Sequence, residues 1–154
     1  MKILTFVVVL VMLVGLTLAL DAAEVSRTGK LVDMQGDVMV KFASSEETLP
    51  AEIGMKISEG DMIMTKADSW VFINLDGVET ATVEVEGNSK VLLAELVMDE
   101  EEGTQQTLLD LAIGKVLVTA QKIHHEDSSF QVKTPTSVVG VRGTTFAVEV
   151  EGLE

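Results

Sequence analysis

The strongest constraint on the fold is the spacing of the apolar residues, which alternate with polar residues from Arg27 to the end of the chain. A period of two is that of a β-strand with one buried face, whereas apolar residues on a helix recur every three or four positions. The faces that alternate in this way are Val38/Val40/Phe42, Val71/Ile73/Leu75, Ala81/Val83/Val85, Val116/Val118/Ala120, Phe130/Val132 and Phe146/Val148/Val150. The sequence therefore predicts an all-β, antiparallel fold with one face of each strand in the core.

Glycine and Asx residues separate these segments at short intervals, and they supply the positive φ that tight connections require. They lie at Gln35–Asp37, Glu59–Asp61, Asp76–Gly77, Gly87–Asn88 and Gly114. About ten short strands joined in this way predict a sandwich, a roll or a β-helical stack. Residues 105–113 are also compatible with a helix, but we favour a strand that leads into a turn at Gly114.

The N-terminus has the layout of a secretory signal peptide, in which a basic start precedes an apolar run and small residues. Lys2 precedes the apolar run of residues 3–20, and Ala22 and Ala23 follow it. We expect cleavage near Ala22, with residues 1–22 as signal peptide and residues 23–154 as one exported domain. The alternative is an uncleaved membrane anchor formed by residues 3–20, since about 20 apolar residues span a bilayer. Both readings place the domain in the periplasm or outside the cell.

Charge excludes one class of partner. The chain carries 25 acidic and 11 basic residues, for a net charge of −14. Nucleic acid binding needs clustered Lys and Arg, so we expect no nucleic acid partner. Because there is no cysteine, neither a disulfide nor a thioether-linked lipid can form.

No metal or cofactor site is predicted. His124 and His125 are adjacent, so on an extended chain their side chains point to opposite faces. The acidic run of residues 99–102 lacks the ligand spacing of a dedicated calcium loop, and we interpret it as a solvated surface loop. No serine lies in a nucleophile elbow or near a credible base, so no catalytic residue is predicted.

Two stretches carry a more specific pattern. The first runs from Glu59-Gly60-Asp61 through Thr65 and Asp76-Gly77 to Gly87-Asn88-Ser89. The second joins Gly114-Lys115-Val116, Thr134-Pro135 and Val141-Arg142-Gly143-Thr144. In this order and spacing they resemble the FecR-like domain family, the family of the periplasmic part of the ferric-citrate regulator, over residues 29–151.

The resemblance implies an all-β envelope domain and a set of motif residues whose role is mainly structural. These are Gly60, Asp61, Thr65, Asp76, Gly77, Asn88, Ser89, Gly114, Thr134, Pro135, Val141, Arg142, Gly143 and Thr144. In the best-known members a cytoplasmic domain that binds a sigma factor precedes the membrane segment. We expect no sigma-factor-binding domain here, and therefore a stand-alone exported member.

Two residues are candidates for partner contact. Arg142 could bind a carboxylate or phosphate of a partner, or an internal carboxylate or carbonyl group. Trp70 lies on the face of its strand opposite Val71 and Ile73, where it could contact a partner or cover the outer end of the sheets. The sequence leaves both alternatives open for each residue.

The expected function is that of a non-catalytic binding or regulatory module in the cell envelope, with a role in signal transduction. Its partner would be an envelope protein or a polysaccharide, and it would need no cofactor. The alternative is a structural component of an envelope or cell-wall assembly, recruited by strand addition at an open sheet edge.

Overall fold

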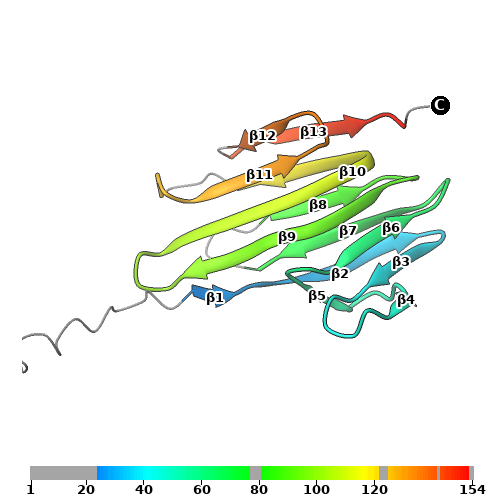
Figure 1. Cartoon of the computed structure of the whole chain (residues 1–154), viewed down its shortest axis with the longest axis horizontal. Coiled ribbons are helices and arrows are strands. Elements are labelled where there is room, and N and C mark those ends of the chain that lie inside the picture. Colours follow the sequence, from blue (N-terminus) through cyan, green and yellow to red (C-terminus); the bar gives the residue numbers. More distant parts are fainter. Residues whose placement is uncertain (1–23, 77–80, 122–124, 142, 153–154) are drawn as a thin grey trace, which may run out of the picture.

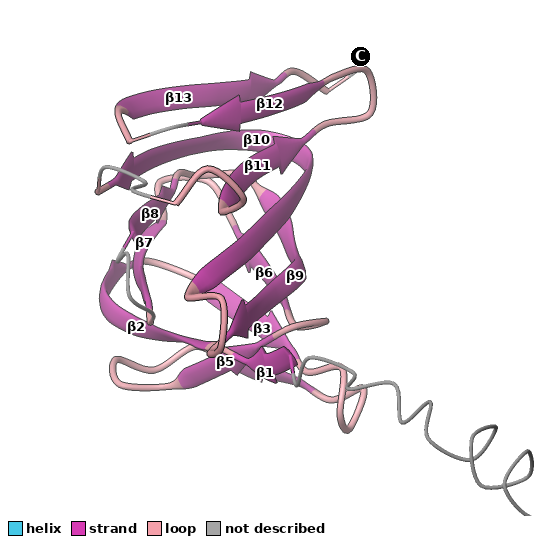
Figure 2. Cartoon of the chain, turned by 90° about the vertical axis from the view of Figure 1, so that its left-hand side faces the viewer, coloured by secondary structure: helices cyan, strands magenta, loops and turns pink. Residues whose placement is uncertain are grey.

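The computed structural model describes residues 24–76, 81–121, 125–141 and 143–152, and these residues form strands, turns and loops with no helix (Figures 1 and 2). The strands are β1 (Glu24–Ser26), β2 (Thr28–Gln35), β3 (Val38–Lys41), β4 (Thr48–Pro50), β5 (Lys56–Ser58), β6 (Met62–Thr65), β7 (Trp70–Leu75), β8 (Ala81–Val85), β9 (Lys90–Asp99), β10 (Thr104–Ala120), β11 (Ser129–Lys133), β12 (Val138–Val141) and β13 (Thr145–Val150). The all-β prediction is confirmed. The expected signal or anchor segment lies outside the described residues. No helix long and apolar enough to cross a membrane occurs in the part that the structure describes.

The strands form two sheets that share β10. The first half of β10 pairs with β9 and β11, and the first sheet runs in the order β4, β3, β6, β9, β10, β11, β12. The second half pairs with β8 and β13, and the second sheet runs in the order β5, β2, β7, β8, β10, β13. β1 pairs with the far end of β9. The result is one sheet of thirteen described strands folded back on itself, as Figure 2 shows.

The bends between the two sheets lie in one row. Three of them join β2 to β3, β6 to β7 and β8 to β9, and the fourth lies within β10. The strands on either side of the bends are neighbours in the same order in both sheets, so the bends follow one another. Each bend contains a residue with positive φ, namely Gly36 at 81°, Asp68 at 56°, Asn88 at 55° and Gly114 at 95°. We call residues 36–37, 66–69, 86–89 and 114–115 the corner row.

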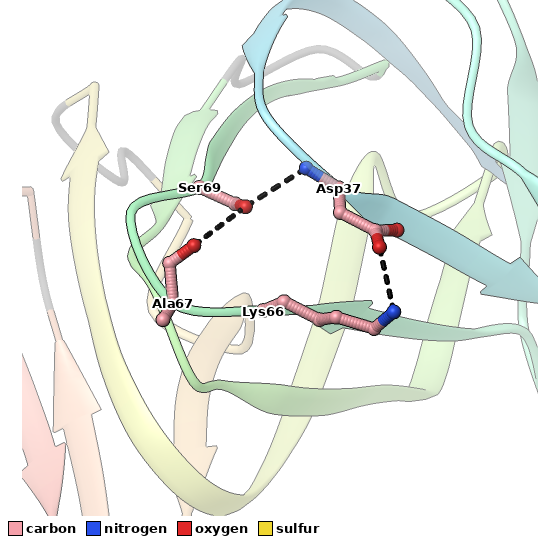
Figure 3. A network of polar contacts seen from close by, with 4 residues as sticks. All are labelled: Asp37, Lys66, Ala67 and Ser69. Carbon is pink, nitrogen blue, oxygen red and sulfur yellow. Dashed lines mark hydrogen bonds and ion pairs between the residues drawn. The ribbon is translucent and has the colours of Figure 1, made fainter.

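Side chains tie each corner to the next. Figure 3 shows the first link, in which the Ser69 hydroxyl accepts the Asp37 N–H at 2.9 Å and donates to the Ala67 carbonyl at 3.2 Å. In the same view Lys66 Nζ lies 2.6 Å from an Asp37 carboxylate oxygen. Both contacts bridge the β2–β3 bend and the β6–β7 bend, so the two bends hold each other in place.

The next links centre on Ser89. Thr65 Oγ1 accepts the Ser89 N–H at 3.0 Å and donates to the Glu86 carbonyl at 2.5 Å. Ser89 Oγ accepts the Lys115 N–H at 2.9 Å, which connects the β8–β9 bend to β10. A Cβ atom on Gly114 would lie 2.1 Å from Ser89 Oγ, so only glycine fits here. The prediction of a turn at Gly114 is wrong. The chain bends there but remains a strand, because Ser89 and the partner strands in both sheets form hydrogen bonds with β10 on either side of the bend.

The inner faces of the two sheets form a single core. The alternating faces named from the sequence point inward, with Val40, Val71 and Val118 each fully buried. Phe42, Ala120, Phe146 and Val150 pack against the same cluster while partly exposed. Of the three architectures considered, the folded sheet corresponds to the sandwich or roll, because neighbouring strands in the stack are antiparallel.

Two further expectations need correction. Strand pairing is antiparallel except that β10 and β11 run parallel, in a register that pairs Leu109 with Val132. The parallel pair arises because the chain crosses from the end of β10, in the second sheet, back to the first sheet before β11. The expectation of short strands fails for β10, which has 17 residues because it belongs to both sheets.

Candidate binding site

A groove opens where the corner row ends. Beyond β10 the first sheet continues with β11 and the second with β13, and these two strands are not consecutive in the chain, because β12 lies between them. The groove between their ends has a volume of about 890 Å³. Its walls are residues 112–113 of β10, residues 134–137 of the β11–β12 turn with Val139, and residues 147–152 of β13 and the segment after it. Both views place β12 and β13 side by side at this end of the molecule (Figures 1 and 2).

Two backbone hydrogen bonds show to which neighbouring strand each residue in the second half of β10 directs its N–H and C=O groups. Glu86 donates its N–H to the Lys115 carbonyl at 3.0 Å, on the β8 side. Ala120 donates its N–H to the Thr144 carbonyl at 3.4 Å, on the β13 side. Successive residues of an antiparallel strand direct their backbone groups to opposite edges. The even-numbered residues in this half of β10 therefore form their backbone hydrogen bonds with β13.

The same alternation defines the open edge of β13. Val116 pairs with Val148, so the backbone groups of Val148 point to β10. Those of Ala147 and Glu149 therefore point away from β10, to the other edge of β13, and both residues line the groove. β13 has no second strand partner among the described residues. The groove thus combines a strand edge available for pairing with an accessible wall.

The lining of the groove is largely apolar. Ile113 is 39% exposed and Val139 is 36% exposed, so both present aliphatic surface to solvent. The charged residues of the lining are Glu149 and Glu151, and both are exposed. A surface of this kind suits an apolar ligand that also carries positive charge.

Thr134 and Pro135 form one wall of the groove. Thr134 is 8% exposed, and its Oγ1 accepts the Ser137 N–H at 3.0 Å while its own N–H donates to the Ser137 carbonyl at 2.8 Å. Pro135 follows as the second residue of the turn, a position that suits its fixed φ. The Thr-Pro motif therefore shapes the wall, and its polar groups are used within the turn.

The last motif segment leads into β13. Val141 ends β12 opposite Phe130, and Gly143 has φ 76°. Thr144 accepts the Ala120 N–H just before β13 begins at Thr145. Gly143 and Thr144 therefore lie in the connection that leads into β13. Arg142 lies outside the described residues, so neither of its two interpretations is tested.

The remaining motif residues lie away from the groove. Asn88, Ser89 and Gly114 belong to the corner row, and Thr65, the last residue of β6, is hydrogen-bonded to it through Ser89. Asp61 is 4% exposed, and its two carboxylate oxygens accept the N–H groups of Ala43 at 2.9 Å and Ser58 at 2.8 Å.

Gly60, with φ 87°, precedes Asp61 and packs against Ala43. Asp76 accepts the Thr28 hydroxyl at 2.5 Å. Gly77 lies outside the described residues.

Arg27 is a buried cation that the sequence analysis did not single out. It is 5% exposed, its Nε donates to the Asp76 carbonyl at 2.6 Å, and a terminal guanidinium N–H donates to Thr107 Oγ1 at 2.9 Å. It thereby links the first strands to β7 and β10. Its position at the start of the alternating region was visible, but its neighbours are 49 and 80 residues away in the chain.

Trp70 lies on the outer face of the second sheet. It is partly buried and makes an edge contact with Phe72, with ring centroids 5.3 Å apart. Trp70 is not part of the groove lining, because β8 and β10 separate β7 from β13. The predicted face of Trp70 is confirmed; its contact with a partner is not tested.

No group of three or more metal-ligating side chains occurs within the described ranges. His125 is exposed, whereas His124 lies outside them. The acidic run begins at Asp99, the last residue of β9, and residues 100–102 lie in the turn to β10, where Asp99 accepts the N–H groups of Glu101 and Glu102 at 2.9 and 3.0 Å. The predicted surface loop is confirmed for residues 100–102, whereas Asp99 belongs to the strand.

Lys115 is surrounded by carboxylates on the outer face of the second sheet. The hydrogen bond and charge of Glu86, at 2.7 Å from Lys115 Nζ, raise the pKa of Lys115 above its ordinary value of 10.5. Glu149 and Glu84 act in the same direction. Negative charges therefore outnumber the positive charge of Lys115 at this end of the sheet.

We expect Glu86→Gln to lower the pKa of Lys115 more than Glu149→Gln does. A raised lysine pKa stabilises the fold fully below pH 10.5, and this contribution is lost as the pH rises through the folded-state pKa. NMR titration of the Lys115 side chain in the two variants measures the shift. Equal pKa values in the parent and in Glu86→Gln would show that the ion pair is absent in solution.

A family model for the FecR protein matches residues 61–153. No curated protein and no solved structure matches the chain. The matched range contains most of the corner row and the whole groove, and it covers more than half of the chain. The chain therefore belongs to the FecR protein family, whose members act in general in regulation or signal transduction.

Proposed function

We propose that this chain is a non-catalytic regulatory module of the cell envelope that binds a partner protein in the groove between β13 and the β11–β12 turn. The general role in regulation comes from the family. The single observation that carries the binding function is the groove itself, where an open strand edge lies beside exposed aliphatic side chains. The signal-like sequence of residues 1–22 supports the location in the envelope.

The chemistry of the lining supports binding more than catalysis. Hydrolytic or acid–base chemistry needs a nucleophile and a base in contact, or two carboxylates with separated roles. The Ser and Thr side chains of the lining belong to the turn at Thr134, and Glu149 and Glu151 are both exposed. Apolar contact and backbone pairing are what these residues can provide.

A photo-crosslinking amino acid at Ile113, in the full chain produced in its native host, tests the proposal. We expect a specific adduct with a second protein in the exported fraction, because Ile113 is an exposed part of the groove wall. The matched control is Ile53, which is 63% exposed but lies between β4 and β5, at the other end of the sheets. Adducts of equal yield from both positions, or none from Ile113, would contradict a binding role for the groove.

A structural role in an envelope assembly is the second candidate, and the exposed edge strand β12 favours it. Val138 is 60% exposed, and β12 carries neither charge nor proline. An assembly component would self-associate or sediment with cell-wall material. The crosslinking experiment separates the two, because an adduct of Ile113 with a second copy or with wall polymer would support assembly.

A further inference from the structure

We propose that the groove binds an extended segment of its partner in which basic and apolar residues alternate, and that this segment adds as a strand to the open edge of β13. This inference rests on the proposed function, and it names the chemistry and the geometry of the partner. The groove offers three things that such a segment needs, namely unpaired backbone groups, an apolar wall and negative charge.

The backbone groups come from Ala147 and Glu149, which line the groove and direct their N–H and C=O groups away from β10. An added strand would use these groups and would extend the second sheet by one strand. Strand addition of this kind draws affinity from main-chain hydrogen bonds and specificity from alternate side chains.

Edge strands in stable proteins are commonly protected by shortness, lysine or proline. β4 has three residues and ends in Pro50, and β5 has three residues and begins with Lys56. β13 has six residues with no proline, lysine or arginine. Its open edge is therefore less protected than the edges at the other end of the sheets.

The side chains that would flank the added strand differ on its two faces. Glu149 is exposed on the outer face, Val148 lies on the inner face with 8% exposure, and Glu151 is exposed just after the end of β13. Residues of an added strand directly opposite Glu149 would project to the outer face, where lysine or arginine complements the carboxylates. The alternate residues would project inward over Ile113 and Val139, where an aliphatic side chain is favoured.

The charge of the groove predicts the charge of the partner segment. The lining contains two carboxylates and no basic side chain among its described residues, and the chain as a whole has a net charge of −14. Lys115 lies opposite Glu149, but it forms its ion pair with Glu86. A segment that carries acidic residues would be repelled by the same groove.

The geometry also predicts which backbone positions of the partner matter. We propose that the segment adds antiparallel to β13. In that arrangement the residue opposite Glu149 forms a hydrogen-bonded pair with it, so the basic residues of the segment would exchange N–H and C=O groups with β13. The apolar residues would direct their N–H groups to solvent. N-methylation of the basic residues would therefore prevent binding, and N-methylation of the apolar residues would not.

The experiment uses the full exported chain and end-capped synthetic peptides of about seven residues. The first probe alternates lysine and valine, the second alternates glutamate and valine, and two further versions of the first are N-methylated at lysine or at valine. We expect the lysine–valine peptide and its N-methyl-valine version to bind. We expect the glutamate peptide and the N-methyl-lysine version to bind at least about tenfold more weakly.

Amide hydrogen exchange gives a signature that non-specific attraction cannot produce. On binding, exchange should slow at Ala147 and Glu149, while Val148, whose N–H already faces β10, should change little. Ala147→Pro should abolish binding without unfolding the protein, since its N–H makes no bond to β10. Thr48→Pro is the matched control, because Thr48 lies in the edge strand β4, where its N–H likewise makes no bond to the neighbouring strand; this variant should bind as the parent does.

Two results would overturn the inference. One is equal binding of the N-methyl-lysine peptide or of the glutamate peptide, since strand pairing and charge would then be irrelevant. The other is protection of Ala147 and Glu149 that rises with protein concentration in the absence of peptide, since a second copy would then occupy the edge. If Ile113 forms its adduct in cells but no peptide binds, the proposed function stands and strand addition fails.

Discussion

Replacing Gly114 by valine is expected to lower the free energy of unfolding by about 4 kcal/mol, because it combines a left-handed backbone with a steric clash. Gly114 has φ 95°, a region in which β-branched residues are strongly disfavoured. An added Cβ atom would lie 2.1 Å from Ser89 Oγ and 2.4 Å from Ser89 Cα. Ser89 cannot move aside freely, because its N–H is bound to Thr65 and its hydroxyl to the Lys115 N–H.

The midpoint of urea unfolding, followed by circular dichroism, measures the effect. Gly140→Val is the matched control, since a Cβ atom there has no atom within 4 Å and the position lies in a strand. We expect this control to change stability by less than about 0.5 kcal/mol. Similar losses at both positions would mean that the corner row does not hold β10 in the way described.

Replacing Asp61 by alanine is expected to lower the free energy of unfolding by about 3 kcal/mol, because two charged hydrogen bonds are lost and two amides are left unsatisfied. Asp61 is 4% exposed, and its carboxylate accepts the N–H groups of Ala43 and Ser58 at 2.9 and 2.8 Å. Water cannot easily replace the carboxylate at so buried a position. The loop between β3 and β4 should then lose its attachment to the turn before β6.

Thermal unfolding measures the loss, and hydrogen exchange at Ala43 locates it. Asp33→Ala is the matched control, because Asp33 is exposed and accepts only the N–H of the adjacent Met34. We expect it to cost less than about 0.5 kcal/mol. A loss of that size for Asp61→Ala would show that its hydrogen bonds are replaced by solvent.

The inward faces were predictable because side-chain direction in a strand has a period of two, whatever its partner strand. Val71, Val83, Val118 and Val132 all point into the core as their spacing predicted. Partner strands were not predictable in the same way. The parallel pairing of β10 with β11 depends on where the chain re-enters the first sheet, and alternation carries no information on that point.

The motif residues were found from the sequence, but their grouping was not. Hydrogen bonds join Thr65 to Ser89 across 24 residues and Ser89 to Lys115 across 26 residues, and nothing in the sequence links these positions. Gly114 was expected to end a strand because glycine with positive φ commonly marks a turn. In the structure the strand continues through Gly114, and glycine is required there because a Cβ atom would clash with Ser89 of the neighbouring bend.

The groove residues, too, were only partly predictable from the sequence. Thr134 and Pro135 were singled out by their motif, whereas Ile113, Ala147 and Glu149 were not. In the sequence Glu149 and Glu151 are the polar positions of an alternating strand, and nothing local distinguishes an edge strand from a central one. Only the absence of a strand beside β13 among the described residues makes their edge available.

The sequence by itself determined the all-β class, the side of each strand that enters the core, the acidic character and the membership in the FecR protein family. These properties depend on local spacing and composition, which tertiary contacts do not alter. The tertiary structure alone decided the path of β10 through both sheets, the row of corners and the open edge of β13. Those features arise from pairings between distant segments, whose free energies depend on which strands meet and not on the pattern within any one of them.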